Sequence, residues 1–170
     1  MKVLISNDDG IQAPGIRALA ELTRELADVW IVAPDREQSA KSHALTMNTP
    51  LRAPEVREGE WAVSGTPADC IYLAVQSLLP SQPDLILSGI NRGANLGHDV
   101  FYSGTVAAAL EGALRNVPSI AFSLDGEGSN CEWHWETAVA VARHVVTNLI
   151  AGDGFSFGPV SYTHLTLPTT

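Results

Sequence analysis

Residues 3–10 read Val-Leu-Ile-Ser-Asn-Asp-Asp-Gly, and this is the most informative stretch of the sequence. A short apolar run ends abruptly in an asparagine, two adjacent carboxylates (Asp8 and Asp9) and a glycine. In an open α/β sheet, ligands bind just outside the carboxyl ends of the strands. Neighbouring acids at such a place repel each other unless a cation joins them, which favours a metal site. A turn that uses Asp and Gly for their backbone freedom is the other interpretation, and at this point both stay open.

Short apolar runs alternate with helical patterns along the rest of the chain. Strands are predicted at residues 3–5, 29–33, 51–53, 61–64, 84–88 and 118–123, and helices at residues 14–26, 67–79, 103–115 and 133–151. Residues 35–50 and 89–102 are predicted to be long polar loops. Continuous apolar strands separated by helices indicate a parallel sheet covered on both faces. The predicted class is therefore α/β, a Rossmann-like three-layer α/β/α sandwich with a mostly parallel sheet.

Composition and charge exclude several classes of function. The 170 residues carry a net charge of −9 and contain no run of Lys or Arg, which argues against a nucleic-acid polymer as partner. Cys70 lies among apolar residues and Cys131 in a polar loop, so no disulfide or zinc framework is expected. No apolar stretch approaches the ~18 residues that span a bilayer, and the N-terminus lacks a signal peptide. We expect a cytoplasmic protein that does not bind membranes.

The last stretch of the chain departs from this pattern. Residues 152–159 are rich in Gly and Phe, and no buried strand is expected after the final helix. Residues 160–170, Val-Ser-Tyr-Thr-His-Leu-Thr-Leu-Pro-Thr-Thr, resemble a translated sequencing adapter. We therefore expect a domain over residues 1–151, followed by a Gly-rich end and a non-native tail over residues 152–170.

Four segments follow predicted parallel strands or open the helix beyond one, so the fold should bring them to one edge of the sheet. They are residues 7–10, 39–48, 89–97 and 103–105. Their side chains are carboxylates, hydroxyls and amides, which suit magnesium, manganese or calcium better than zinc. The edge is therefore predicted to be a site for a hard divalent cation.

Residues 103–105, Ser-Gly-Thr, open a helix whose early turns are Ala-rich and free of bulk. Exposed N–H groups and two hydroxyls at that place are suited to phosphate, although an ordinary Ser/Thr helix cap has the same residues. A location opposite a metal site favours the phosphate interpretation. The Gly/Asn-rich residues 89–97 match neither GxGxxG nor a P-loop, and no GxSxG nucleophile elbow is present.

Six motifs together resemble the SurE family of survival-protein nucleotidases. The resemblance runs in order from residue 1 to about residue 149. The motifs are Ser-Asn-Asp-Asp-Gly (6–10), Ala-Pro-Gly (13–15), Val-Ala-Pro-Asp-Arg (32–36), Gly-Thr-Pro-Ala-Asp-Cys (65–70), Ser-Gly-Ile-Asn-Arg-Gly-Ala-Asn-Leu-Gly (88–97) and Tyr-Ser-Gly-Thr-Val-Ala-Ala-Ala (102–109).

The resemblance implies a phosphatase that hydrolyses nucleoside 5′- and 3′-monophosphates with one divalent cation, magnesium or manganese. It also implies a homo-oligomer whose contacts depend on a C-terminal segment that this chain lacks. The family's metal ligands fall on Asp8, Asp9, Ser39 and Asn91, and its phosphate-binding residues on Asn95, Ser103, Gly104 and Thr105. Asp8 and Asp9 are also the candidate catalytic residues, since either carboxylate can orient the attacking water.

Two other functions fit parts of the sequence. A phosphate-accepting receiver domain also opens with a strand that ends in paired acids. It should carry an Asp after its third strand and a Lys near its fifth, but residues 61–64 end at Gly65 and no Lys follows Lys41. A truncated nucleotide- or phosphate-binding fragment without turnover is the remaining alternative.

Overall fold

The computed structural model describes residues 1–126, 133–152 and 162–167. Its sheet has seven strands in the order β3-β4-β2-β1-β5-β6-β7. All neighbouring pairs are parallel except β3 and β4, which are antiparallel. The strands are β1 (Lys2–Ser6), β2 (Asp28–Pro34), β3 (Glu55–Arg57), β4 (Glu60–Val63), β5 (Leu85–Arg92), β6 (Ser119–Leu124) and β7 (Tyr162–Leu167).

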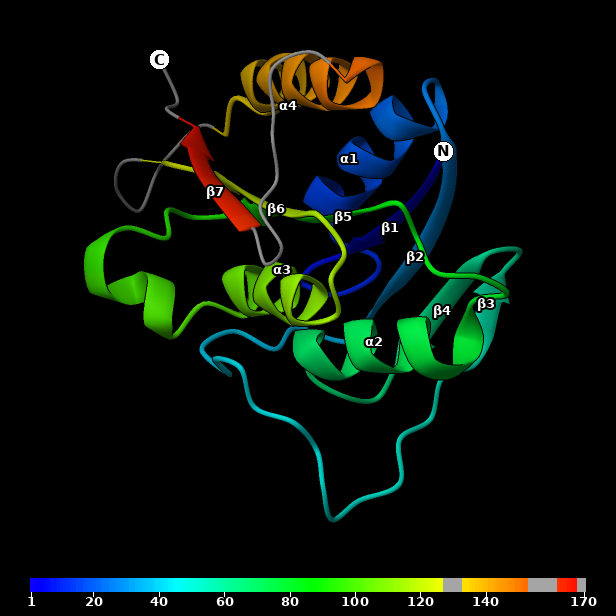
Figure 1. Ribbon diagram of the computed structural model, residues 1–170. Coiled ribbons are helices and arrows are strands. Elements are labelled where there is room, and N and C mark those ends of the chain that lie inside the picture. The colour runs from blue at the N-terminus through cyan, green and yellow to red at the C-terminus, as the bar shows by residue number, and fades with distance from the viewer. Residues whose placement is uncertain (127–132, 153–161, 168–170) are drawn as a thin grey trace.

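Helices cover both faces of this sheet, as the apolar strands require. They are α1 (Pro14–Arg24), α2 (Pro67–Leu73), which continues into the π-helical turn η1 (Ala74–Leu78), α3 (Gly104–Leu114) and α4 (Trp135–Ala151). In Figure 1, α1 and α4 lie on one side of the strands, and α2 and α3 on the other. The predicted three-layer α/β/α sandwich with a mostly parallel sheet is confirmed.

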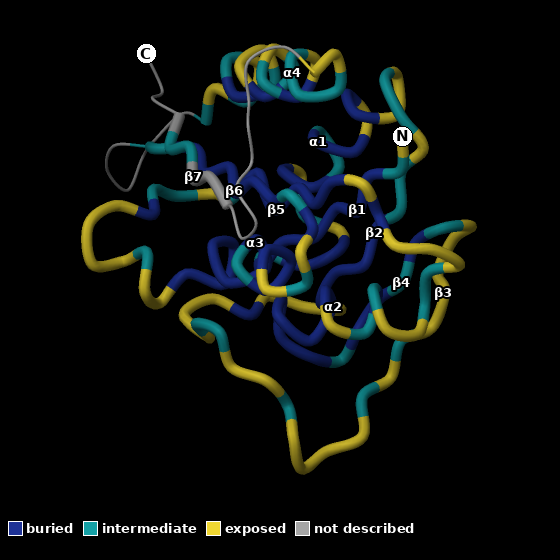
Figure 2. Tube along the Cα trace, viewed as in Figure 1, coloured by how far each residue is buried: buried dark blue, intermediate teal, exposed yellow. Residues whose placement is uncertain are grey.

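Alternating side chains of β1 build the two halves of the core. Val3 and Ile5 pack with α1 and α4, whereas Leu4 packs with α2 and α3. All three are fully buried. Figure 2 shows the same contrast along the chain, with buried central strands and largely exposed loops. Burial on both faces explains why residues 3–5 are continuously apolar rather than alternating.

The predicted strand at residues 51–53 is wrong. Residues 52 and 54 do lie beside β4, because the N–H groups of Ser64 and Ala62 donate to the carbonyls of Arg52 and Pro54. Pro54 has no N–H to return, so a regular ladder cannot form there. The edge strand β3 begins at Glu55, directly after Pro54. The turn that connects it to β4 contains Gly59, whose φ is +73°.

The predicted loop over residues 89–102 is shorter than expected. β5 continues to Arg92, because Asn91 and Arg92 resume pairing with β6 after an irregularity that follows Ser88. Gly89 has a φ of +124°, and a Cβ there would lie 2.4 Å from the carbonyl oxygen of Phe122. A glycine is therefore required for the bulge. A 3-10 helix, η2 (Gly97–Phe101), occupies the end of the segment.

A strand also follows the last helix, contrary to the sequence-based expectation. β7 pairs in parallel with β6 from Tyr162 opposite Ser119 to Leu167 opposite Leu124. The Tyr and Thr residues of this segment have high strand propensity, which explains how a polar stretch adds to the edge of the sheet. Whether residues 160–170 are native stays a prediction. Cys131 lies outside the described residues.

Candidate functional site

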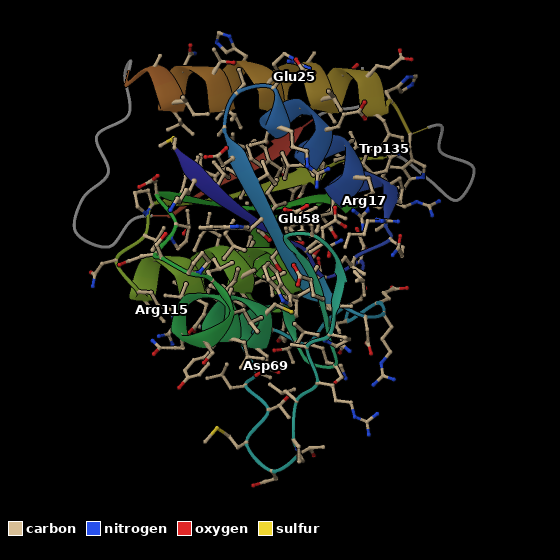
Figure 3. The ribbon with its side chains drawn as sticks, turned by 90° about the vertical axis from the view of Figure 1, so that its right-hand side faces the viewer. Arg17, Glu25, Glu58, Asp69, Arg115 and Trp135 are labelled. Carbon is tan, nitrogen blue, oxygen red and sulfur yellow. The ribbon has the colours of Figure 1, made fainter. Side chains whose placement is uncertain are left out.

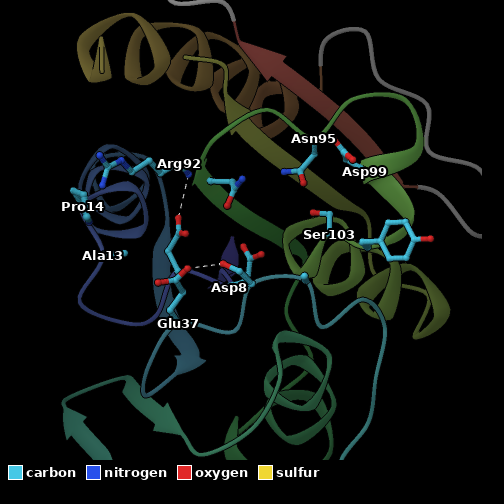
Figure 4. Close-up of a pocket in the computed structure, with 13 residues that line it drawn as sticks. Asp8, Ala13, Pro14, Glu37, Arg92, Asn95, Asp99 and Ser103 are labelled. Atoms are coloured by element: carbon cyan, nitrogen blue, oxygen red, sulfur yellow. Dashed lines mark hydrogen bonds between the residues drawn. The ribbon is translucent and has the colours of Figure 1, made fainter. Parts of the chain in front are cut away.

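A pocket of about 710 Å³ opens at the carboxyl ends of the central strands. It is lined by Asp8, Asp9, Ala13, Pro14, Glu37, Ser39, Ala40, Asn91, Arg92, Asn95, Asp99, Tyr102 and Ser103. All four predicted metal ligands are among these residues, together with Asn95 and Ser103. Figure 4 shows Asp8, Glu37 and Arg92 toward one side of the pocket, and Asn95, Asp99 and Ser103 toward the other. The fold therefore brings the predicted segments together.

Asp8 and Asp9 lie just after β1, where Asp8 is buried and Asp9 is half-buried. Burial, and less strongly the charge of Asp9, raises the pKa of Asp8 from 3.8 to about 6. Burial, together with the charge of Glu37, also raises the pKa of Asp9. No Lys, Arg or His side chain in the described part of the chain forms a salt bridge with either carboxylate. A buried and a half-buried acid thus lie side by side, and neither forms a salt bridge in the described part of the chain; the charge of Arg92 only partly offsets the effects that raise the pKa of Asp9.

The start of α3 closes tightly over Asp8. The hydroxyl of Thr105 donates a hydrogen bond of 2.5 Å to Oδ1 of Asp8. A Cβ on Gly104 would lie 2.7 Å from the Cβ and 2.9 Å from Oδ2 of the same aspartate. Neither residue is among those that line the pocket, and their contact with phosphate stays a prediction. Thr105 instead fixes the orientation of the Asp8 carboxylate.

The other three predicted ligands come from separate segments. Oδ2 of Asp9 accepts a hydrogen bond of 3.1 Å from the backbone N–H of Arg92. The Asn91 amide donates to the carbonyl of Gly93, and this bond leaves its Oδ1 available as a ligand. The Ser39 hydroxyl donates to Oε1 of Glu37 at 2.7 Å, which leaves its oxygen lone pairs available. Each side chain therefore keeps an oxygen for a cation.

Asn95 and Ser103 form the opposite wall. Ser103 is the N-cap of α3, and its Oγ accepts a hydrogen bond from the N–H of Val106. Nδ2 of Asn95 donates to the hydroxyl of Ser123 at 2.8 Å. The positive end of the α3 dipole thus lies against Asp8 and next to Asn95 and Ser103, an arrangement that favours negative charge at this part of the pocket.

Hydrogen bonds hold the long loop that carries Ser39 in place. Ser42 donates from its N–H to the carbonyl of Tyr102 and from its hydroxyl to the carbonyl of Phe101. Farther along, Thr46 donates from its N–H and its hydroxyl to the two carboxylate oxygens of Asp69. Asp69 belongs to the capping box of α2 and lies beside the long loop in Figure 3. A segment without regular structure is thereby fixed next to the pocket.

Sequence reasoning did not assign a role to several lining residues. Glu37 lies two residues before Ser39, and its carboxylate is a third acid at the pocket. Arg92, Asp99 and Tyr102 also line it. The only sequence signal that these residues line the pocket was that they lie in or near the quoted motifs. Spacing alone does not show which side chains of a loop point into a pocket.

The donor set fits a hard divalent cation. Carboxylate, amide and hydroxyl oxygens are the ligands that magnesium and manganese accept. Asp8 and Asp9 form no salt bridge in the described part of the chain, and a bound cation would supply the charge that balances them. The described residues contain no cluster of three His, Cys, Asp or Glu side chains suited to a metal, so a site here requires the neutral oxygens of Ser39 and Asn91 as well.

Comparison with known proteins agrees with this geometry. The family model described as "Survival protein SurE" matches residues 3–166. The chain belongs to the SurE family. The predicted resemblance is thereby confirmed, and the match includes every residue assigned to the site.

Individual SurE proteins are similar over most of this chain. The protein named 5′-nucleotidase SurE of Pelobacter propionicus is 55% identical over 157 residues, which make up 91% of this chain and 64% of the relative. The protein of the same name from Geotalea daltonii is 52% identical over 91% of this chain and 63% of its own length. The crystal structure of the SurE protein from Aquifex aeolicus superposes with a TM-score of 0.90 at 38% identity, covering all of this chain and 67% of that one. The chain thus spans slightly less than two thirds of the named 5′-nucleotidases.

The free energy of unfolding of the cation-free chain is expected to depend on pH through Asp8. Because the pKa is raised to about 6 in the folded state, the folded chain holds this proton more tightly than the unfolded chain. The proton on Asp8 therefore contributes to the free energy of unfolding in full below about pH 4. This contribution is lost as the pH rises through 6, and at pH 7 the free energy of unfolding is lower by ~3 kcal/mol. Urea titrations of wild type and Asp8→Asn should therefore diverge from pH 4 to pH 7, with the variant more stable at pH 7. A difference that does not change with pH would contradict this assignment.

Proposed function

We propose that this chain hydrolyses nucleoside 5′- and 3′-monophosphates to nucleoside and phosphate, with one bound magnesium or manganese ion. The observation that carries the proposal is the pocket in which a buried and a half-buried carboxylate, Asp8 and Asp9, lie together beside the N-terminus of α3. The name 5′-nucleotidase, which the relatives from Pelobacter propionicus and Geotalea daltonii bear, supports the same activity.

Side chains from the ends of two strands, β1 and β5, and from the long loop would hold the cation. In this proposal its ligands are Asp8, Asp9, Ser39 and Asn91. A divalent cation held there would polarise phosphoryl oxygens and make water more acidic. Asp8 or Asp9 would orient the attacking water toward phosphorus.

The opposite wall would bind the phosphate. Asn95 and Ser103 contribute polar groups, and the α3 dipole favours the negative charge of the ester. Gly104 permits close approach of the helix start to Asp8, which sets the separation between the two walls. Thr105 positions the Asp8 carboxylate through its hydrogen bond rather than by contact with substrate.

The energetic demand of the reaction favours a bound cation over hydrogen bonds alone. Hydrolysis of a phosphate monoester is among the slowest uncatalysed reactions, and full catalysis requires on the order of 25–30 kcal/mol. One hydrogen-bond donor at a developing charge contributes only ~3–4 kcal/mol. The polar side chains of this pocket would therefore fall short unless a cation shared the charge.

Release of inorganic phosphate from AMP tests the proposal. We expect phosphate release with Mn²⁺ or Mg²⁺ and none with excess chelator. Asp9→Asn should lower the rate at least ~100-fold, because loss of a metal ligand should cost more than the 10–100-fold typical of residues that hydrogen-bond to metal ligands. Asp28→Asn is the matched control, since it makes the same change at an exposed residue of β2. Equal activity in Asp9→Asn and wild type would overturn the assignment. Tight AMP binding without phosphate release would instead favour the binding fragment without turnover.

Other expectations from the sequence stay predictions. They include the cytoplasmic location, the homo-oligomeric state of the family, the boundary near residue 151 and the non-native tail. Within the residues that the structure describes, no helix has the length and apolar character needed to span a bilayer. Sequencing the gene past the codon for residue 159 would test the tail.

A further inference from the structure

One aromatic side chain borders a pocket that is otherwise lined by acids, amides, hydroxyls and small residues. Among the described lining residues, only Tyr102 has a π-face. Its side chain is not part of the core, since the residue is 63% exposed. An exposed ring at a polar pocket gains little from folding, so its position points to a ligand with a flat apolar surface.

The backbone of Tyr102 is fixed from two directions. Its N–H donates to the carbonyl of Asp99 at 3.0 Å, which ends η2. Its carbonyl accepts the N–H of Ser42 at 3.0 Å, which ties it to the loop that carries Ser39. The ring is therefore presented from an anchored main chain rather than from a free loop tip. Pre-organisation of this kind reduces the entropy lost when a ligand stacks on the ring.

Tyr102 also lies next to the wall assigned to phosphate. It directly precedes Ser103, and consecutive Cα atoms are about 3.8 Å apart. A phosphate at Ser103 and Asn95 would place the sugar and base of a nucleotide within a few ångströms of this ring. The pocket volume of about 710 Å³ lies within the range of small-molecule sites and leaves room for the base.

The other flat cationic or aromatic surface at the pocket is already engaged. The Arg92 guanidinium lies 5.0 Å from the ring centre of Trp133, so one of its faces is covered. Its backbone N–H is bound to Asp9. Phe101 is more exposed than Tyr102, at 73%, but it does not line the pocket. These differences separate Tyr102 from its neighbours.

We propose that the ring of Tyr102 stacks on the base of the nucleotide and is the residue that distinguishes nucleotides from phosphomonoesters without a base. This inference rests on the proposed function and adds to it a residue for base recognition. Stacking is tolerant of the base, because every base has a π-face. The site should therefore accept purine and pyrimidine nucleotides alike, with a preference for the larger ring.

Two substrates separate base recognition from hydrolysis. AMP and ribose 5-phosphate share the ester and the sugar and differ in the base. With Mn²⁺ present, we expect the ratio of kcat/KM for AMP to that for ribose 5-phosphate to fall about tenfold in Tyr102→Ala, chiefly through the KM for AMP. Tyr102→Phe keeps the ring and should restore the ratio to within about twofold of wild type. Phe101→Ala is the matched control and should leave the ratio unchanged.

Each outcome bears on one proposal. A ratio unchanged in Tyr102→Ala, or one that falls equally in Phe101→Ala, would overturn the role of Tyr102. A ratio that falls in Arg92→Ala and not in Tyr102→Ala would assign the base to the other side of the pocket. Failure of wild type to release phosphate from both substrates would count against the proposed function itself. Equal wild-type kcat/KM for the two substrates would leave the phosphatase proposal intact and refute base stacking.

Discussion

Replacing Asp8 by asparagine is expected to lower cation-dependent phosphate release by more than ~100-fold. Asparagine keeps the shape of the side chain and can still accept the hydrogen bond from Thr105, so the fold should persist. The negative charge that binds the cation is lost. Mutation of a residue that hydrogen-bonds to a metal ligand typically lowers activity 10–100-fold, and mutation of the ligand itself should lower it further. Initial rates of phosphate release at saturating Mn²⁺ measure the loss.

Substitutions of Thr105 provide the matched comparison. Thr105→Val keeps the volume but removes the donor to Asp8, and we expect a loss of ~10–100-fold. Thr105→Ser keeps the hydroxyl and should retain most of the activity. If Asp8→Asn and Thr105→Val both retained wild-type activity, Asp8 would not be a cation ligand. If Thr105→Val equalled Asp8→Asn, the threonine would contact substrate directly.

Gly15→Ala is expected to destabilise the fold severely. A Cβ at this position would lie 1.9 Å from the carbonyl oxygen and 2.9 Å from the carbonyl carbon of Ile90. Both atoms belong to the backbone of β5, so neither can move away by a change of rotamer. Helix α1 would have to separate from the sheet, at a cost that exceeds the ~1 kcal/mol gained from helix propensity. We expect a loss of at least ~3 kcal/mol in the free energy of unfolding, measured by urea denaturation.

Gly112→Ala offers a matched glycine in another helix. Its Cβ would lie 2.3 Å from Oγ of Ser119 and 2.6 Å from Cδ1 of Ile86. These are ends of side chains that can rotate, so the loss should be smaller than for Gly15→Ala. A Gly15→Ala chain as stable as wild type would show that α1 does not pack on β5 as closely as described.

The periodicity of apolar residues correctly predicted the helices and strands whose burial and capping agree with their intrinsic propensity. The apolar run before Ser6 and the helix opened by Pro67 are examples, because burial and capping there agree with propensity. Periodicity did not predict that β5 passes its bulge at Gly89 and continues to Arg92, because that segment is stabilised by pairing with β6. The same reason applies to β7, an edge strand that depends on β6 for its hydrogen bonds.

The candidate site could be predicted from its chain positions but not in its contacts. Asp8 and Asp9 follow β1 and Asn91 lies at the end of β5, and these neighbouring strands end at one edge of the sheet, so topology brings the three residues together. The hydrogen bond from Thr105 to Asp8 forms only because α3 packs closely against the end of β1. Such a tertiary contact cannot be read from the local sequence. Glu37 and Tyr102 lie in segments whose conformation depends on hydrogen bonds between distant parts of the chain. The periodicity of apolar residues does not predict such hydrogen bonds.

Anomalous scattering from a crystal of the chain soaked in Mn²⁺ would show whether Asp8 and Asp9 bind a divalent cation. We expect one anomalous peak per chain, in contact with carboxylate oxygens of Asp8 and Asp9 and with the side-chain oxygens of Ser39 and Asn91. Metal–oxygen distances should be slightly above the 2.0–2.1 Å typical of the smaller Mg²⁺, at about 2.1–2.2 Å. The same peak should vanish in Asp8→Asn crystals. A pocket without a peak at millimolar Mn²⁺, or a peak that avoids both aspartates, would contradict the account.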